Sequence, residues 1–132
     1  MKTFNLLVSI PEETFFEGRV SSLKAKNPNG EFQILANYEP FVSIVSPSTL
    51  TLVDENGTKS SYFISEGVIE TKGDKVILCV NSIDKKEDID LAKAEEAKVR
   101  AEQRLASNQY NIDRNRAKLS LARAKERIKF AK

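Results

Sequence analysis

The chain has 132 residues, of which 40% are apolar, and this is enough for one modest hydrophobic core. Its net charge of +2 is unevenly divided, because residues 1–84 carry 7 Lys and Arg against 11 Asp and Glu, whereas residues 85–132 carry 14 against 8. The absence of histidine and the presence of a single cysteine, Cys79, exclude an internal disulfide and the usual zinc and haem sites.

The first 84 residues have the pattern of short β-strands. Residues 4–10 alternate apolar with polar or smaller side chains, which is typical of a strand with one buried face. Two pairs of turn-forming residues, Asn56-Gly57 and Gly73-Asp74, each separate two such runs and predict hairpins. Further strands are expected at residues 15–20 and 20–25, kinked around Gly18, and at residues 32–35, 41–45, 50–53, 62–65, 68–72 and 75–81. This spacing predicts a sandwich or a barrel.

Cys79 lies in an uninterrupted apolar run, residues 76–80. Such a run is typical of a strand that is buried on both faces. Because a buried cysteine usually packs as a small hydrophobic residue, we expect Cys79 to belong to the core rather than to a reactive site.

The last third of the chain has the pattern of two helices, expected at about residues 90–106 and 112–130. Asp88 or Asp90 is expected to cap the first helix and Asn111 the second, and the short connection makes the helices antiparallel. Their apolar stripes are mostly alanine: Leu91, Ala94, Ala97, Ala101 and Leu105 in the first, and Ala117, Leu121, Ala124 and Ile128 in the second. Because alanine buries little apolar area, we expect a weakly closed, movable hairpin.

No motif for catalysis or membrane insertion is found in the sequence. There is no histidine base, no Gly-x-Ser-x-Gly and no phosphate-binding glycine loop, so nothing indicates an active site. No run reaches about 18 apolar residues, and the N-terminus leads into a strand rather than a signal peptide. We therefore expect a soluble protein that is cytosolic or docked peripherally.

Two basic stripes are the clearest functional pattern. Spacings of seven and four place three basic residues on one face of each helix: Lys93, Arg100 and Arg104 in the first, and Arg116, Arg123 and Arg127 in the second. Guanidinium groups bind phosphate oxygens well, so two such stripes brought together would hold a polyphosphate. The alternative is a solvated face that keeps the hairpin soluble.

A nucleic-acid-binding protein and a small hydrolase are the other functional alternatives. A basic arm suits nucleic-acid phosphates, but acidic residues interrupt both helices, and only Tyr110 and Phe130 are available there to stack on bases. A hydrolase on a β-sandwich has no nucleophile, base or metal cluster in this sequence to support it.

Four short motifs together identify a family. They are Phe15-Phe16-Glu17-Gly18-Arg19-Val20, Gly30-Glu31-Phe32-Gln33-Ile34-Leu35 with Pro40 following, Ser65-Glu66-Gly67-Val68-Ile69-Glu70, and Glu87-Asp88-Ile89-Asp90. In this order and spacing the chain resembles, over essentially its whole length, the epsilon subunit of bacterial F-type ATP synthase, called delta in mitochondria. The resemblance implies an all-β N-terminal sandwich, residues 1–84, followed by an α-helical hairpin, residues 88–132.

The resemblance implies a non-catalytic rotor subunit rather than an enzyme. In that family the sandwich binds the gamma subunit of the central stalk and the membrane c-ring, and so couples proton translocation to ATP synthesis. The hairpin lies folded on the sandwich or extends along gamma into the alpha/beta catalytic head, where it inhibits ATP hydrolysis. This implies a peripheral position on the cytoplasmic face of the cell membrane and no required cofactor.

Some members of the family bind regulatory ATP on the folded hairpin through the motif Ile/Leu-Asp-x-x-Arg-Ala. Here the motif reads Ile89-Asp90-Leu91-Ala92-Lys93-Ala94, in which a lysine offers a point charge where the family has the bidentate fork of arginine. The ATP-binding residues that the resemblance implies are Asp84, Ile89, Asp90, Lys93, Ala94, Arg100, Arg123 and Arg127.

The resemblance also implies a loop that contacts the c-ring. Relatives have Pro-Gly-His or Pro-Asn-His in this loop, whereas this chain has Ala36-Asn37-Tyr38. Tyr38 offers an amphipathic surface where the histidine would be. The implied c-ring contacts are Glu31, Tyr38 and Glu39.

Overall fold

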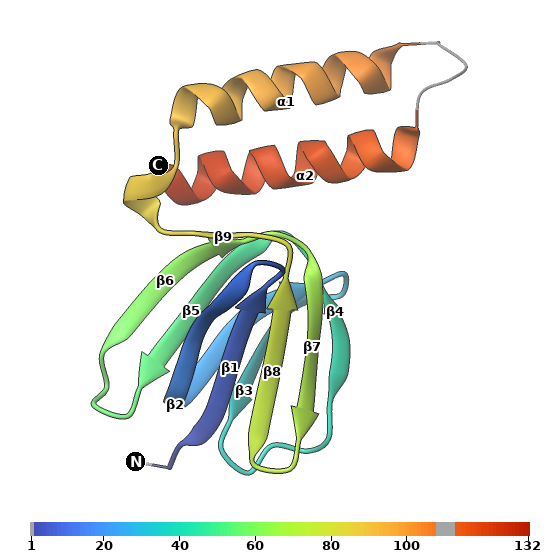
Figure 1. Cartoon of the computed structure of the whole chain (residues 1–132). Coiled ribbons are helices and arrows are strands. Elements are labelled where there is room, and N and C mark those ends of the chain that lie inside the picture. The colour runs from blue at the N-terminus through green and yellow to red at the C-terminus, as the bar shows by residue number, and fades with distance from the viewer. Residues whose placement is uncertain (1, 108–112) are drawn as a thin grey trace. The chain divides into compact units, whose positions relative to one another are not determined.

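The computed structural model describes residues 2–107 and 113–132. The chain divides into two compact units, residues 1–84 and residues 85–132. Strands build the first unit and helices the second (Figure 1). The expected fold class, an all-β sandwich followed by an α-helical hairpin, is therefore confirmed.

The first unit is a sandwich in which two sheets share one long strand, β2. One sheet has the strand order β4-β7-β8-β1-β2, and the other continues from β2 through β5 and β6 to β9, with β3 also paired to β2. Strands β1 and β8 run parallel, and the two expected hairpins, β5–β6 and β7–β8, are antiparallel. The strands are β1 Phe4–Ile10, β2 Glu13–Asn27, β3 Gly30–Leu35, β4 Val42–Val45, β5 Ser48–Asp54, β6 Lys59–Ile64, β7 Gly67–Lys72, β8 Lys75–Val80 and β9 Ile83–Asp84.

Strand β2 passes from one sheet to the other. Its first half pairs with β1, and its second half pairs with β3 and β5. The register shifts between Val20 and Ser22, where pairing passes from β1 to β5. Gly18, in contrast, lies in regular register opposite Leu6. The prediction of two strands kinked around Gly18 is therefore wrong, because the irregularity accompanies the change of partner strand.

The core lies between the two sheets. Side chains reach it from alternate positions, as in β1, where Phe4, Leu6 and Val8 are buried and Leu7 is not. The buried cluster consists of Phe4, Leu6, Val8, Val20, Leu23, Ala25, Ile34, Val45, Leu50, Leu52, Ile64, Ile69, Val76, Leu78 and Val80. The other positions of these strands point away from the core, so the outer faces of the sheets are available for contacts.

Cys79 is exposed, so the prediction of a core thiol is wrong. In β8 the buried positions are Val76, Leu78 and Val80, and Ile77 and Cys79 alternate with them on the opposite face. The run of residues 76–80 is continuous because both faces of the strand carry apolar residues, whereas only one face is buried in the core.

The second unit is an antiparallel pair of helices, α1 Leu91–Ala106 and α2 Arg114–Ala131, preceded by a short 3-10 helix, η1 Lys86–Asp88 (Figure 1). The fully buried residues of the two helices are all alanines that belong to the expected stripes: Ala94, Ala101, Ala117 and Ala124. Alanine at these positions lets the two helix backbones approach closely but buries little apolar area.

Both helices begin at an aspartate. The side chain of Asp90 accepts a hydrogen bond from the main-chain N–H of Lys93 at 3.2 Å, and that of Asp113 accepts from Arg116 at 3.1 Å. Asp90 is one of the two caps expected for the first helix. Asn111, the cap expected for the second, and the expected start at residue 112 lie outside the described residues.

Candidate functional site

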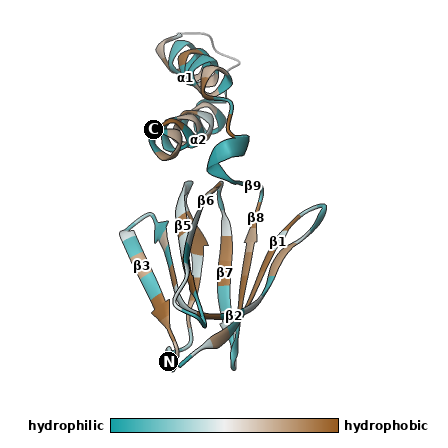
Figure 2. Cartoon of the chain, turned by 90° about the vertical axis from the view of Figure 1, so that its left-hand side faces the viewer, coloured by the Kyte–Doolittle hydropathy of each residue, from teal (hydrophilic) through white to brown (hydrophobic). Residues whose placement is uncertain are grey.

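Six apolar side chains form a patch on the outer face of the sheet that contains β4, β7, β8 and β1. The strand register aligns one row from Ile44 through Val68 to Cys79. The adjoining row runs from Val42 through the exposed Glu70 to Ile77 and Leu7, so one carboxylate lies among these apolar side chains. Figure 2 shows hydrophobic segments on the neighbouring strands β7, β8 and β1. This outer apolar patch consists of Leu7, Val42, Ile44, Val68, Ile77 and Cys79.

The outer apolar patch has the exposure of an interaction surface. Val42 is 70% exposed, Ile44 61% and Val68 47%. An antiparallel sheet whose outer face meets only solvent normally alternates apolar and polar residues, and contiguous exposed apolar surface marks a binding site. This surface was not predicted from the sequence, although its signal was present in the apolar residues on both faces of residues 76–80.

Tyr38 is fixed to the turn between β7 and β8. Its hydroxyl donates to the main-chain oxygen of Gly73, and its ring packs edge-on against Phe4 with the ring centroids 5.7 Å apart. Burial, and to a smaller extent the negative charge of Asp74, raises the pKa of the Tyr38 hydroxyl. The neighbouring Asn37 has φ 65°, a left-handed conformation that asparagine tolerates. The loop expected to contact the c-ring is thus held in a defined conformation.

Glu31 lies at the opposite end of β3 from the Tyr38 loop. Its carboxylate is 3.9 Å from the amine of Lys24, and their side chains are 68% and 50% exposed, so this ion pair contributes little to stability. From Glu31 to Leu35 the strand spans about 13 Å before the loop with Tyr38 and Glu39 begins. The length of β3 therefore separates Glu31 from Tyr38 and Glu39 along the chain.

The two basic stripes gather on one side of the hairpin. The buried alanines form the seam between the two helices. In each helix a basic residue directly precedes one of these alanines, as Arg100 precedes Ala101 and Arg123 precedes Ala124. Because the helices are antiparallel, residues that precede the seam positions of either helix lie on the same side of the seam. Like charges gathered in this way favour an anion. This basic flank carries Lys93, Arg100, Arg104, Arg116, Arg123 and Arg127.

The other residues of the expected ATP site have local structural positions. Asp90 caps α1, and Ala94 is buried in the seam. Ile89 ends η1, where its main-chain N–H donates to the oxygen of Lys86 at 3.3 Å. Asp84 belongs to β9 in the first unit. Within the hairpin, phosphate binding would therefore depend on the cations of the basic flank.

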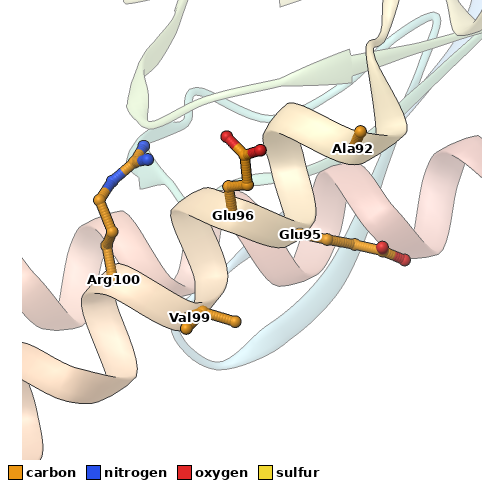
Figure 3. Close-up of a pocket in the computed structure, with 5 residues that line it drawn as sticks. All are labelled: Ala92, Glu95, Glu96, Val99 and Arg100. Atoms are coloured by element: carbon orange, nitrogen blue, oxygen red, sulfur yellow. The ribbon is translucent and has the colours of Figure 1, made fainter.

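A shallow hollow of about 540 Å³ lies on α1, lined by Ala92, Glu95, Glu96, Val99 and Arg100. Figure 3 shows the side chains of Glu96 and Arg100 on the same side of the helix. Two carboxylates against one guanidinium make the hollow negatively charged, so it repels a polyphosphate. Arg100 therefore separates two surfaces of opposite charge, the basic flank and this acidic hollow.

Three kinds of feature are absent from the part of the chain that the structure describes. Among residues 2–107 and 113–132, no helix is long and apolar enough to cross a membrane. In the same ranges, no group of three or more Cys, Asp and Glu side chains is arranged to hold a metal ion. Unpaired buried polar atoms are also absent, because every buried side-chain nitrogen or oxygen in these ranges has a hydrogen-bond partner.

Two family models match consecutive parts of the chain. Residues 3–86 match the β-sandwich domain of the ATP synthase Delta/Epsilon chain, and residues 87–132 match the long α-helix domain of the same chain. The chain belongs to the ATP synthase delta/epsilon family. The resemblance carried by its four motifs is thereby confirmed, and the boundary between the two family domains falls next to β9.

Relatives within the delta/epsilon family are similar along most of the chain. The ATP synthase epsilon chain of Clostridium novyi (strain NT) is 35% identical over 129 residues, which cover 98% of each chain. That of Clostridium perfringens (strain SM101 / Type A) is 42% identical over 105 residues, or 80% of this chain and 79% of the relative.

Chains in two solved structures have the same fold. One is a chain of the Euglena gracilis mitochondrial ATP synthase, in a structure of OSCP/F1/c-ring in rotational state 1. It aligns with a TM-score of 0.82 and 22% identity, and the alignment covers 94% of this chain and 78% of that chain. A chain in the central stalk/c-ring of the Tetrahymena thermophila enzyme aligns with a TM-score of 0.67 and 14% identity over 99% and 98%. At these identities the similarity establishes the fold.

Proposed function

We propose that this chain is a non-catalytic rotor subunit in the central stalk of an F-type ATP synthase. Its sandwich would bind the gamma subunit and the c-ring, and so couple proton translocation to ATP synthesis as a peripheral subunit at the cytoplasmic face of the cell membrane. The observation that carries this proposal is the outer apolar patch, because a rotor subunit needs a firm attachment to the shaft. Membership of the delta/epsilon family supports gamma as the protein that covers it.

Covering the outer apolar patch would supply much of the binding free energy. Val42, Ile44 and Val68 expose 70%, 61% and 47% of their surface, and burying apolar surface contributes about 25 cal/mol per Å². The patch lies on paired strands rather than on a loop, so it keeps its shape on binding. A preformed apolar surface loses little conformational entropy on association, which favours a stable attachment.

Co-purification with the gamma subunit tests this attachment. Val68→Asp places a charge between Ile44 and Cys79, and we expect it to abolish co-purification because the charge would have to be desolvated. The matched control is Thr49→Asp, at an exposed position of β5 in the other sheet, and it should bind gamma normally. Equal recovery of gamma with both variants would show that the patch is not the docking surface.

We assign the c-ring contact to Glu31, Tyr38 and Glu39. The fixed conformation of the Tyr38 loop supports this assignment, because a rigid loop loses less entropy when it binds. Cysteines placed at Glu31 and Glu39, in a Cys79→Ser background, should each form disulfides with cysteines in the polar loops of the ring. Absence of cross-linking from both positions would remove this surface from the ring contact.

The helical hairpin is proposed to act as a brake that inhibits ATP hydrolysis when it extends along gamma into the alpha/beta head. Its seam of buried alanines supports this role, since a small buried area lets the folded and extended states differ by only a few kcal/mol. Truncation after Asp88 should raise ATP hydrolysis by the assembled enzyme while leaving its assembly intact. Unchanged hydrolysis would eliminate the brake and leave the coupling role standing.

Regulatory ATP is proposed to bind the basic flank and favour the folded hairpin. The arrangement of Lys93, Arg100, Arg123 and Arg127 on one side of the seam supports it, because a polyphosphate would relieve their mutual repulsion. Titration of the subunit with ATP should give a response that the Arg123→Ala/Arg127→Ala variant loses. A matched Lys118→Ala/Lys125→Ala variant, changed at exposed lysines of the same helix, should retain it. Equal responses from both variants would place ATP elsewhere.

A further inference from the structure

The side of α1 that faces away from the alanine seam carries an apolar ridge. Ala92, Val99 and Ala106 are spaced seven residues apart, and Val99 is 50% exposed. They lie on the opposite side of the helix from the buried Ala94 and Ala101. A β-branched residue lowers helix propensity, so an exposed Val99 costs local stability without filling any core. This combination suggests that Val99 contributes to binding.

The acidic hollow on α1 has the geometry of a coiled-coil hole. Four of its lining residues, Ala92, Glu95, Glu96 and Val99, stand at positions i, i+3, i+4 and i+7 (Figure 3). Four residues at these spacings form the hole that receives one knob side chain of a facing helix. The same spacing and similar chemistry recur one heptad later, in a second quartet formed by Val99, Glu102, Gln103 and Ala106.

The charge of the two holes defines the side chains that would enter them. Each hole has small apolar residues at its two ends and acidic or amide residues at its sides, and Glu95, Glu96 and Glu102 are all exposed. A lysine or arginine suits such a hole, because its aliphatic stem packs against Val99 while its charged end reaches the carboxylates. A phosphate group or an anionic membrane surface would be repelled by the same carboxylates.

We propose that the ridge of Ala92, Val99 and Ala106, with its rim of Glu95, Glu96 and Glu102, is a docking site for a basic amphipathic helix of another protein, whose lysines or arginines recur every seven residues. This surface is on the opposite side of α1 from the seam, so the partner helix binds without opening the hairpin. It adjoins the basic flank, which carries the proposed ATP site, at Arg100, a residue that also lines the hollow. The charge complementarity sets the class of partner, and the seven-residue repeat sets its register.

A synthetic helical peptide tests the proposal with the full chain. The peptide has three identical heptads with lysine at the first position, leucine at the fourth and alanine elsewhere, so that a lysine is the knob for each hole and the lysines oppose self-pairing of the peptide. Its fluorescence anisotropy should rise on titration with the chain. A scrambled peptide of the same composition has the same charge without the repeat, and we expect it to bind about tenfold more weakly or not at all.

Variants of the chain separate the docking site from general charge attraction. Glu95→Gln/Glu96→Gln/Glu102→Gln should weaken peptide binding about tenfold or more. The matched control, Glu12→Gln/Glu13→Gln/Glu55→Gln, removes the same charge from exposed positions in the sandwich and should bind the peptide unchanged. Val99→Lys should abolish binding because it places a like charge on the ridge. Circular dichroism of each variant should show unchanged helix content, since all the altered positions are exposed.

Three results would overturn the proposal. The first is equal binding of the ordered and scrambled peptides, which would indicate attraction by charge alone. The second is equal loss of binding in the two glutamine variants, which would remove α1 as the location. The third is a dimer of the chain, seen by light scattering and dissociated by Val99→Lys, because the ridge would then bind a second copy instead of another protein.

Discussion

The guanidinium group of Arg114 donates a hydrogen bond to the main-chain oxygen of Leu105 at 2.8 Å. Its second terminal nitrogen donates to the main-chain oxygen of Ser107 at 2.7 Å. Arg114 is the first residue of α2, and Leu105 is in the last turn of α1, so one side chain joins the two ends that the connection links. The last carbonyl groups of a helix have no partner within the helix, and the cation also complements the negative end of its dipole. Arg114 therefore caps α1 and fastens the hairpin at the same time.

Removal of the Arg114 side chain should loosen the hairpin at its connected end. Each hydrogen bond from a charged donor contributes about 1.5–3 kcal/mol to the free energy of folding. Because this pair is exposed to solvent, the expected loss of stability in Arg114→Ala is smaller, about 1 kcal/mol. Amide hydrogen exchange should accelerate in the last turn of α1 and the first turn of α2. Lys118→Ala, which removes an exposed cation from the same helix, serves as the control and should leave exchange unchanged. Similar exchange in the two variants would mean that the alanine seam alone holds this end.

Asp90 is the second capping residue that can be tested, and it also belongs to the expected ATP site. Its side chain accepts from the main-chain N–H of Lys93 at 3.2 Å. Asp90→Ala should lower helix stability by about 1 kcal/mol, whereas Asp90→Asn should retain the cap, because asparagine caps as well as aspartate. Circular dichroism during heating measures the helix, and ATP titration measures the site. If Asp90→Asn loses ATP binding with its helix intact, the carboxylate has a role beyond capping.

The helices show what sequence periodicity can and cannot predict. Their existence and the alanine seam followed from spacings of three and four, because buried residues repeat with the turn of the helix. Their antiparallel arrangement followed from the short connection between them. The bonds made by Arg114 follow no period, since they depend on where the connection brings a long side chain. Nor could the sequence show that Glu95, Glu96 and Val99 line one hollow beside Arg100, because solvated charges and docking surfaces share the same composition.

The sandwich shows a second limit, in the strand β8. An apolar residue at every position indicates that both faces are apolar, but it does not reveal whether both lie in the core. Val76 and Leu78 are buried, whereas Cys79 is exposed beside Val68. The outer apolar patch takes shape only when the register aligns β4, β7, β8 and β1, and register depends on pairing between segments far apart in the chain.

Gly67 permits the close approach of β7 and β8 that builds the outer apolar patch. A Cβ atom at this position would lie 1.9 Å from the main-chain oxygen of Cys79 and 2.7 Å from the Cα of Val80, so one strand would have to move. Gly67→Ala should therefore destabilise the sandwich by about 3 kcal/mol and weaken gamma binding, as measured by urea unfolding and co-purification. Gly18→Ala is a suitable control, because there the nearest atom, at 3.2 Å, is the far end of the Phe16 ring. A Gly67→Ala chain as stable as this control would show that the strands can separate at little cost.

The Tyr38 hydroxyl should make the stability of the sandwich depend on pH in the alkaline range. Burial, with a smaller contribution from the charge of Asp74, raises the pKa of Tyr38 above its ordinary value of 10.0, so folding favours the protonated hydroxyl, the form that donates to Gly73. The resulting stabilisation is complete below the unfolded-state pKa of about 10 and is lost as the pH rises through the folded-state pKa.

Urea unfolding of Tyr38→Phe tests this dependence. The substitution should lower the free energy of unfolding by about 1 kcal/mol at neutral pH, and the difference in that free energy between the variant and the unaltered chain should shrink above pH about 10. Tyr62→Phe, which removes a hydroxyl from a ring packed against Phe15, is the control and should keep the alkaline loss of stability. A difference between the Tyr38→Phe and unaltered chains that stays constant with pH would show that the hydroxyl does not titrate with folding.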